Sequence, residues 1–164
     1  MYLSLIRSLI LPTRELFFPY NGISVYSDTW IENNIQHIVV YIYDDTGLPI
    51  GMAYRNSTMV DQAYEYYFFA KNAQGDIVAI YNPAGAKLIE YTYDAWGNTT
   101  IAYHNGGAST SARYNSLTYR GYFYDSETGL YYLNSRYYDP AIGRFITPDN
   151  YINANGDITG FNMY

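Results

Sequence analysis

A degenerate internal repeat constrains this chain more than any other feature: an Asp or Asn is followed, three or four residues later, by a Gly. A Tyr precedes most copies, and tyrosine fills 23 of the 164 positions. Asp and Asn accept hydrogen bonds from backbone N–H groups two residues on, and Gly takes positive φ at little steric cost, so each copy predicts a turn. The pairs are Asp44 with Gly47, Asn72 with Gly75, Asn82 with Gly85, Asp94 with Gly97, Asp125 with Gly129 and Asp139 with Gly143.

Strand-like segments flank these turns. Aromatic and β-branched residues fill 38–43, 64–70, 76–81 and 99–103, and residues 87–93 alternate with the period of a strand. The turn residues at 72, 82 and 94 recur every 10 to 12 residues, which is the pace of successive hairpins. The pattern predicts an all-β fold, with helix confined to short pieces.

Charge and cysteine content exclude several classes of function. The formal net charge is −6, and the 9 Lys and Arg residues form no cluster, so neither nucleic acid nor an anionic membrane surface is an expected partner. The absence of Cys excludes disulfides and thiolate metal sites. No stretch approaches the ~20 apolar residues of a membrane span. Charged residues make up only 15% of the chain, so either other protein covers its surface or Tyr, Asn, Ser and Thr supply the polar groups.

Few residues could carry chemistry. His37 and His104 are the two imidazoles, and we expect both to be solvated at strand ends rather than to bind a metal. Asp125 and Glu127 could mimic the carboxylate pair of a glycosidase, but they lie in a repeated turn, which favours a capping role. We therefore expect no catalytic residue, no metal and no cofactor.

The tyrosines leave two interpretations open. Exposed rings could stack on sugars, which would make the chain a binding module for cell-surface glycans or for a partner protein. Cross-strand aromatic pairs, each worth roughly 0.2–1 kcal/mol, give the same composition a purely structural role. Binding to a glycan array would separate the two.

Several segments together resemble a known family. Residues 93–98, 119–125, 128–140 and 143–145 closely resemble the RHS repeat-associated core of bacterial Rhs and wall-associated proteins. The same repeat builds the tyrosine–aspartate (YD) shell of teneurins. The resemblance implies antiparallel hairpins that form part of a curved β-shell, with an irregular, plug-like C-terminal region.

The resemblance also implies an organisation of the chain. Residues 1–37 are a poorly assigned N-terminal segment, an incomplete upstream repeat. Residues 38–103 are degenerate YD repeats, and 104–116 are an exposed loop rich in Gly, Ser and Asn. Residues 117–164 are the RHS repeat-associated core, which we expect to be truncated before the family's Asp-Pro-x-Gly cleavage motif, so that no cleavage chemistry is carried onto this chain. Arg120, Arg136 and Arg144 fall in the tightest part of the resemblance, and we expect each to stack on a Tyr and reach a carboxylate as a strut of the plug.

The function that the resemblance implies is non-catalytic. Family shells enclose or present a C-terminal toxin, so the implied partners are the rest of the β-shell and a toxin domain. The full-length protein is expected to be secreted or held at the cell surface, and no signal peptide is expected in this sequence. Unpaired strand edges and aromatic surface should make the isolated chain self-associate.

Overall fold

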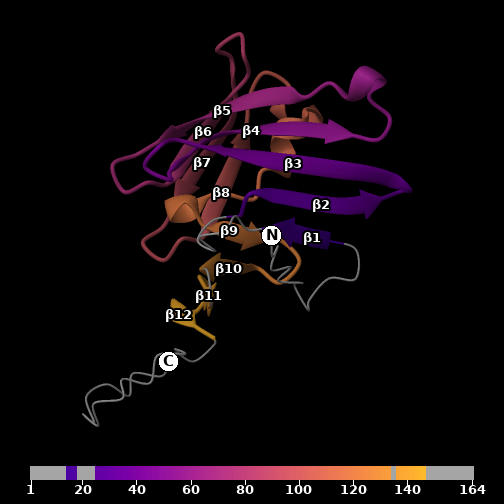
Figure 1. Ribbon diagram of the computed structural model, residues 1–164. Helices are drawn as coiled ribbons and strands as arrows, with labels where there is room; N and C mark the ends of the chain where they lie inside the picture. The colour runs from indigo at the N-terminus through magenta and orange to yellow at the C-terminus, as the bar shows by residue number, and fades with distance from the viewer. Residues whose placement is uncertain (1–13, 18–24, 134–135, 147–164) are drawn as a thin grey trace, which may run out of the picture.

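The computed structural model describes residues 14–17, 25–133 and 136–146. This part of the chain folds into two antiparallel sheets, and the all-β prediction is confirmed (Figure 1). Its only helical pieces are short 3-10 turns: η1 (Val60–Gln62), η2 (Gly107–Ser109), η3 (Ser111–Tyr114) and η4 (Tyr119–Gly121). Within the described residues, no helix has the length and apolar character that a membrane span requires.

The large sheet has eight strands, and the small sheet has four. The large sheet consists of β1 (Arg14–Phe17), β2 (Ser27–Glu32), β3 (Ile35–Tyr43), β4 (Pro49–Asn56), β5 (Glu65–Lys71), β6 (Ile77–Tyr81), β7 (Lys87–Tyr93) and β8 (Thr99–Tyr103). The small sheet consists of β9 (Phe123–Asp125), β10 (Leu130–Leu133), β11 (Arg136–Asp139) and β12 (Arg144–Phe145). Within each sheet every strand pairs with its neighbours in sequence, as expected of a chain built from hairpins.

The large sheet is irregular beside its turns. The register shifts between Ile42 and Tyr43, between Ala70 and Lys71, and between Ile80 and Tyr81, each time at the last residues before a repeat turn. A bulge of this kind increases the local twist and bends the strand that carries it. The repeat therefore bends the sheet as well as reversing the chain.

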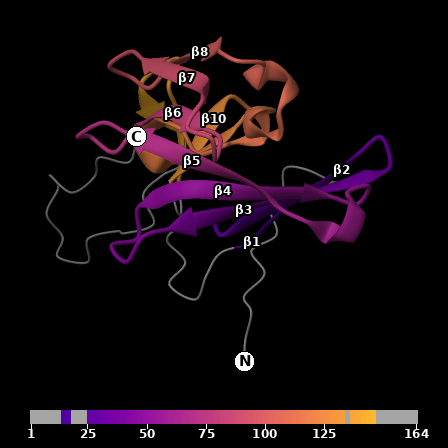
Figure 2. The ribbon, with the colours of Figure 1, turned by 90° about the horizontal axis from the view of Figure 1, so that it is seen from above.

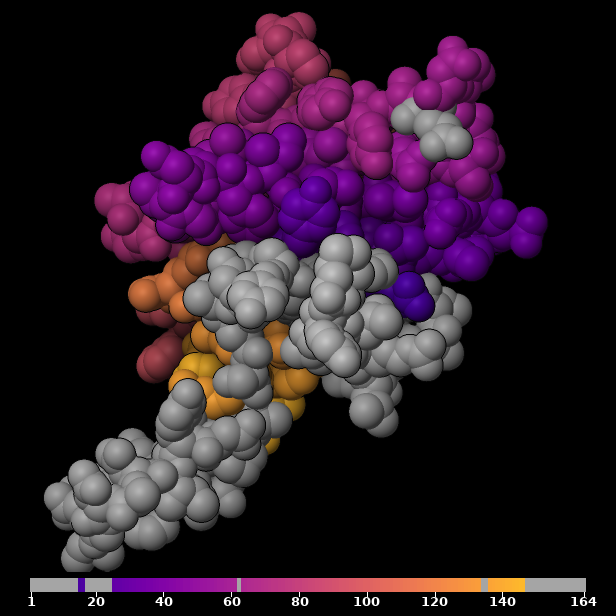
Figure 3. Space-filling model, viewed as in Figure 1, coloured from indigo at the N-terminus to yellow at the C-terminus, as the bar shows by residue number. Residues whose placement is uncertain are grey.

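This bend places strands that are far apart in sequence around one segment. Figure 2 shows β2–β4 on one side of the segment that follows β8, and β7 and β8 on the other side. In the space-filling view, the orange and yellow atoms of the small sheet lie directly against the indigo to magenta atoms of the large sheet (Figure 3).

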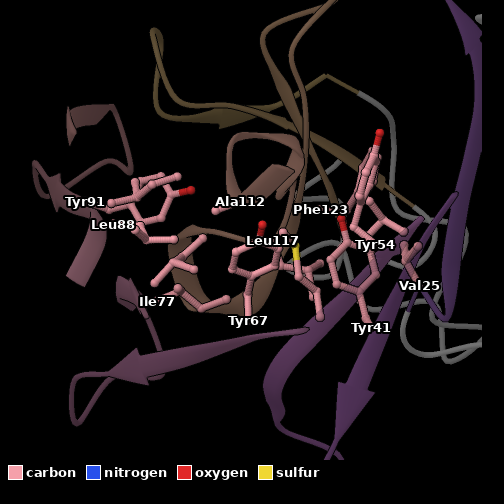
Figure 4. Packing of buried hydrophobic residues seen from close by; sticks show 14 residues of the cluster. Val25, Tyr41, Tyr54, Tyr67, Ile77, Leu88, Tyr91, Ala112, Leu117 and Phe123 are labelled. Atoms are coloured by element: carbon pink, nitrogen blue, oxygen red, sulfur yellow. The ribbon is translucent and has the colours of Figure 1, made fainter. Parts of the chain in front are cut away.

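The hydrophobic core fills the inner side of this bend. Tyr67, Ile77 and Leu88 come from three strands of the large sheet (Figure 4). Leu117 comes from the segment between the two sheets, residues 104–122, here called the crossing chain, and Phe123 comes from β9. All five are almost fully buried. Alternation along the strands points one set of side chains inward, where the crossing chain covers them.

The predicted exposed loop at residues 104–116 is exposed only in part. Ala112 and Gly107 are buried and Asn115 is only 9% exposed, while the exposed residues are Asn105, Gly106, Ala108, Ser109 and Arg113. A Cβ on Gly107 would overlap the carbonyl of Leu88, so the glycine allows the chain to lie directly on β7. Small residues that resemble a solvent loop serve here for close backbone approach.

The remaining predicted segments can be placed in part. Residues 1–37 contain β1, β2 and the first residues of β3, while 1–13 and 18–24 lie outside the described residues. Residues 38–103 supply the rest of the large sheet. Residues 117–146 supply η4 and the small sheet, and 147–164 lie outside the described residues.

Candidate functional site at the junction of the two sheets

The turn at Asp44 shows how a repeat unit is held. Its side-chain Oδ1 accepts the backbone N–H of Thr46 at 3.0 Å and that of Leu48 at 2.9 Å. The N–H of Gly47 donates to the carbonyl of Asp44, and Gly47 has a φ of +81°. Hydrogen bonds from the Thr46 side chain and the Leu48 backbone hold the pKa of Asp44 below its usual value. The carboxylate thus supplies the turn with an acceptor that is charged at neutral pH.

The same arrangement recurs at the next three turns. The side-chain oxygen of Asn72 accepts the backbone N–H groups of Gln74 and Asp76, and that of Asn82 accepts the N–H of Ala86. The carboxylate of Asp94 accepts the N–H groups of Trp96 and Asn98. The glycines of these turns, Gly75, Gly85 and Gly97, all have positive φ. The structure therefore places these predicted turn residues at equivalent positions of successive hairpins.

The two turns of the small sheet are variants with one extra residue. Asp125 accepts the N–H of Glu127 at 3.0 Å and the hydroxyl of Thr128 at 2.9 Å, and Gly129 has a φ of +75°. Asp139 accepts the N–H of Ala141 at 2.8 Å, and Gly143 has a φ of +65°. The carboxylate of Asp125 therefore binds its own turn.

The three arginines that the sequence predicts as struts each have a different environment. The guanidinium of Arg120 lies 5.4 Å from the ring centroid of Tyr119, but its side chain is exposed. Arg136 stacks at 4.0 Å on Phe145, which is not a tyrosine, and Arg144 is exposed. Arg136 is half-buried, so the three arginines lie in different surroundings, and only Arg120 has the expected tyrosine beneath its guanidinium. Backbone and tyrosine contacts join the sheets instead.

Tyr131 on β10 is the centre of the junction. Its side chain is fully buried, and its hydroxyl donates to the carbonyl of Gly97 at 2.9 Å. The same oxygen lies 3.0 Å from the hydroxyl of Thr99 and 3.3 Å from that of Thr118. A phenol has one proton and two lone pairs, so this set satisfies it completely. One tyrosine thus connects the small sheet, the β7–β8 turn and the crossing chain.

The tip of the same turn receives β11 and the turn that follows it. The hydroxyl of Tyr138 donates to the carbonyl of Trp96 at 2.9 Å, and the side-chain amide of Asn98 donates to the carbonyl of Pro140 at 3.2 Å. Gly143 lies so close to Trp96 that an added Cβ would be 2.8 Å from the indole ring. The turn at 94–98 is therefore both a repeat unit and the docking point of the small sheet.

Asp76 forms a second link that the sequence analysis missed. It is only 6% exposed, and its Oδ1 accepts the backbone N–H of Arg120 at 2.9 Å. Arg120 has a φ of +52°, which is unfavourable for a residue with a side chain, so this hydrogen bond stabilises a strained position. The other carboxylate oxygen accepts the amide of Asn72 at 2.6 Å. The available signal was an acid directly after the turn glycine, where the other copies have Leu, Ala, Asn or Arg.

His37 was expected at a solvated strand end, and this expectation is wrong. It is 6% exposed, it stacks on Trp30 with ring centroids 5.0 Å apart, and Tyr114 covers it at 5.3 Å. Its Nδ1 lies 2.7 Å from the hydroxyl of Tyr54. Because the amide of Asn56 donates to that hydroxyl, the phenol proton is directed to His37, which suits a neutral imidazole.

The electrostatic surroundings of His37 act in the same direction. Burial lowers the pKa of His37, and the nearby Arg113 lowers it further, while Glu32 opposes the shift. His104, by contrast, is partly exposed, and its Nε2 lies 3.0 Å from Glu90. Among the described residues, no three His, Asp or Glu side chains lie together as a metal site would require.

A cleft opens beside the junction on the inner side of the large sheet. Its volume is 580 Å³, within the range of about 300–1,000 Å³ that ligand sites occupy. One wall is the inner face of β7 and β8, and another is the end of β2. The crossing chain and the β9–β10 turn form the rest. Burial raises the pKa of Tyr91, which lines this cleft, to about 12, so the phenol is neutral at physiological pH.

The large sheet is built from hairpins, bends around the crossing chain and holds the small sheet on one repeat turn. This arrangement defines a segment of a tyrosine–aspartate β-shell. The teneurin YD-shell family model matches residues 26–164, and the chain belongs to this family.

Its curated relatives are much longer. The chain is 36% identical over 148 residues to the tRNA nuclease WapA of Bacillus subtilis (strain 168), covering 90% of this chain and 6% of that protein. It is 32% identical over 111 residues to double-stranded DNA deaminase toxin A of Burkholderia cenocepacia (strain H111), covering 66% of this chain and 7% of that protein. The chain thus spans well under a tenth of either relative.

Solved structures agree with the fold. A crystal structure of TcdB2-TccC3 superposes with a TM-score of 0.55 at 21% identity, over 84% of this chain and 8% of that chain. The same complex without its hypervariable C-terminal region gives a TM-score of 0.56 at 20% identity, over the same shares. At this identity the likeness concerns the fold alone.

Proposed function

We propose that this chain is a non-catalytic segment of an Rhs-type β-shell, at the position where the wall of the shell turns inward and is closed. The main support for this proposal is the junction between the small sheet and the turn at 94–98 of the large sheet. The hydroxyl of Tyr131 joins the small sheet to the turn at 94–98 of the large sheet, and Tyr138 and Gly143 contact the tip of that turn. A wall strand and a closing sheet are held together by a repeat unit of the wall itself.

The relatives support a structural role. Two proteins that share this segment carry different activities in their names, a tRNA nuclease and a double-stranded DNA deaminase toxin. A segment common to both cannot by itself specify either reaction, and it makes up 6% and 7% of their lengths. In this proposal the catalytic parts lie elsewhere in such proteins, and this segment helps to enclose or present them.

The proposal extends to partners and location. The partners are the remaining repeats of the shell, which continue the sheet edge at β1, and a C-terminal toxin domain on the inner side. The full-length protein acts outside the cell that makes it, either secreted or held at the cell surface.

A segment exchange tests this function. Residues 26–164 replace the matching segment of the Bacillus subtilis relative, and the protease resistance of its nuclease part is compared with that of the parent and of a deletion of the segment. The chimera is expected to protect the nuclease part as the parent does. A Gly143→Val chimera should protect it less, because the new side chain would collide with the Trp96 ring. A chimera digested as fast as the deletion, or tRNA cleavage by the isolated chain, overturns the proposal.

A second candidate function rests on the outer face of β5. Tyr64, directly before the strand, and Tyr66 and Phe68 within it alternate with 36%, 49% and 52% of their surfaces exposed. Arg55 lies over the Tyr64 ring. Exposed rings in a row can stack on the apolar faces of sugars, so the alternative is a binding module for cell-surface glycans or for a partner protein. Glycan-array binding that is lost in Tyr66→Thr and kept in Tyr103→Thr, on the inner face, would favour it.

A further inference from the structure

The edge strand β8 has a strand partner on one side only within the described residues. It pairs with β7, in the register Ile89 with Tyr103 and Tyr91 with Ile101. The N–H of His104 donates to the carbonyl of Leu88, so Leu88 and His104, which follow in the same register, form a hydrogen-bonded pair. Hydrogen-bonded and non-hydrogen-bonded pairs alternate along an antiparallel ladder. The backbone groups of Ile101 and Tyr103 therefore point away from β7.

The side chains of these two residues are also incompletely covered. Ile101 and Tyr103 are 47% and 49% exposed, whereas their partners on β7, Tyr91 and Ile89, are 4% and 1% exposed. All four face the inner side of the sheet. The apolar inner face thus continues onto β8 but is not buried there.

The cleft lies alongside this edge and has a polar opposite wall. Ile101 and Tyr103 line it on one side, and Glu32 and Glu127 line it on the other. Both carboxylates are exposed. Arg113 also lines the cleft, where its guanidinium donates to the carbonyl of Ala108 and the hydroxyl of Tyr114. Its charge offsets one of the two carboxylates, so the rim keeps an excess of one negative charge. The cleft therefore combines an open row of backbone groups, an apolar floor and a negative rim.

We propose that the β8 edge and its cleft bind an extended segment of the enclosed polypeptide by strand addition, an inference that rests on the proposed shell function. The guest backbone pairs with the outward N–H and C=O groups of Ile101 and Tyr103. Alternate apolar side chains of the guest cover the inner side of these residues, and a Lys or Arg of the guest meets Glu32 or Glu127. An extended, unfolded guest has the unpaired backbone that this edge needs.

Charge argues against a second copy of this chain in the same place. Two copies paired through β8 would bring the Glu32 and Glu127 rims of both together, and each chain has a net charge of −6. Like charges placed opposite each other destabilise an interface. A guest with basic residues would instead be attracted to Glu32 and Glu127.

A synthetic peptide in which Val alternates with Lys, as long as the five residues of β8, is the direct probe. Titrated into the full 164-residue chain, it should shift the backbone amide resonances of Ile101 and Tyr103. A matched peptide, N-methylated at the amides that face β8, should bind about tenfold more weakly, because it loses one or two hydrogen bonds. Equal binding of the two peptides would overturn the inference, and so would shifts confined to the outer face at Tyr66 and Phe68.

Variants of the chain give an independent arm. Ile101→Pro removes an N–H that points away from β7, and proline is tolerated at such edge positions. It should lower the affinity for the unmodified peptide about tenfold. The Thr100→Val variant, altered on the opposite face of the same strand, should bind this peptide as tightly as the parent does. If Ile101→Pro fails to fold, the N-methylated peptide alone decides. If Ile101→Pro abolishes self-association of the chain without peptide, the occupant is a second copy and the inference fails.

The two proposals can fail separately. A chimera that still protects its nuclease part, together with an isolated chain that ignores the peptide, overturns strand addition and leaves the shell function standing. A chimera that does not protect its nuclease part overturns the shell function.

Discussion

One residue, Gly97, links the geometry of its turn to the packing of η4 against that turn. Gly97 has a φ of +93°, and a Cβ at this position would lie 2.7 Å from the ring of Tyr119. Gly85 occupies the equivalent position of the preceding turn with a φ of +79° and has nothing within 4 Å. Glycine therefore serves at Gly85 only to adopt positive φ, and at Gly97 both to adopt positive φ and to leave room for the Tyr119 ring.

The pair allows a matched test. Gly85→Ala should lower the free energy of unfolding by about 1 kcal/mol from backbone strain alone, and Gly97→Ala should lower it by about 2–4 kcal/mol because Tyr119 must also move. Urea unfolding of both variants measures the difference. Equal losses would show that the Tyr119 contact contributes nothing.

His37 gives the chain a predictable response to acid. Burial lowers the folded-state pKa below the ordinary 6.5, so between these two values the unfolded chain binds more protons than the folded chain. The free energy of unfolding should therefore fall as the pH drops below 6.5, by at most about 1.4 kcal/mol per pH unit. His37→Phe keeps a ring against Trp30 and should reduce the change in the urea midpoint between pH 7 and pH 5. A variant with the slope of the parent would contradict this assignment.

At the scale of elements, the two sheets should separate before either one unfolds. Tyr131→Phe keeps the ring but removes the hydroxyl shared by Gly97, Thr99 and Thr118. We expect a loss of about 1–3 kcal/mol, because buried partners are left unpaired. Hydrogen exchange should speed up in β9 and β10 and stay unchanged in β3 and β4.

Tyr124→Phe is the control for this prediction. The Tyr124 ring lies 5.0 Å from that of Tyr131, but its hydroxyl makes no hydrogen bond within the described part of the chain. Its removal should leave exchange in β9 and β10 as it is. Faster exchange in β3 and β4 in the Tyr131 variant would mean that the sheets unfold as one unit.

The elements that sequence could predict are those that local chemistry determines. An Asp or Asn and a Gly within five residues suffice for a turn such as 44–48, whatever surrounds it. Tertiary contacts decide the rest. Nothing near Tyr131 in sequence distinguishes it from Tyr132, yet it alone is fully buried at the junction. Residues 104–116 have the composition of a solvent loop, and only the presence of β7 beneath Gly107 turns them into packed structure.

At the scale of the whole molecule, the large sheet remains open. β1 and β8 each have a strand neighbour on one side only among the described residues, and Tyr66 and Phe68 are about half exposed on the outer face. Open edges and aromatic surface invite association. Because the acidic residues beside β8 disfavour a second copy there, we expect self-association through the β1 edge and the outer aromatic face. The isolated chain should sediment as a concentration-dependent mixture at micromolar concentration and bind dyes that report apolar surface. The double variant Tyr66→Thr, Phe68→Thr should bind less dye.

A single sharp monomer peak, no dye binding and a cooperative thermal transition would be the opposite result. They would identify the chain as a closed domain, and the shell-segment proposal would then have to be abandoned.

The turns described above also allow the structure to vary in size. Each one is stabilised by its own Asp or Asn side chain and its own Gly, so a hairpin can be duplicated or lost without altering the hydrogen bonds inside the neighbouring turns. The hydroxyls of Tyr131 and Tyr138 contact the small sheet's docking point within the turn at 94–98, so such changes upstream would leave these two hydrogen bonds intact. An ancestral gene could therefore enlarge or shrink the enclosed space in steps of one hairpin while inheriting the same closure.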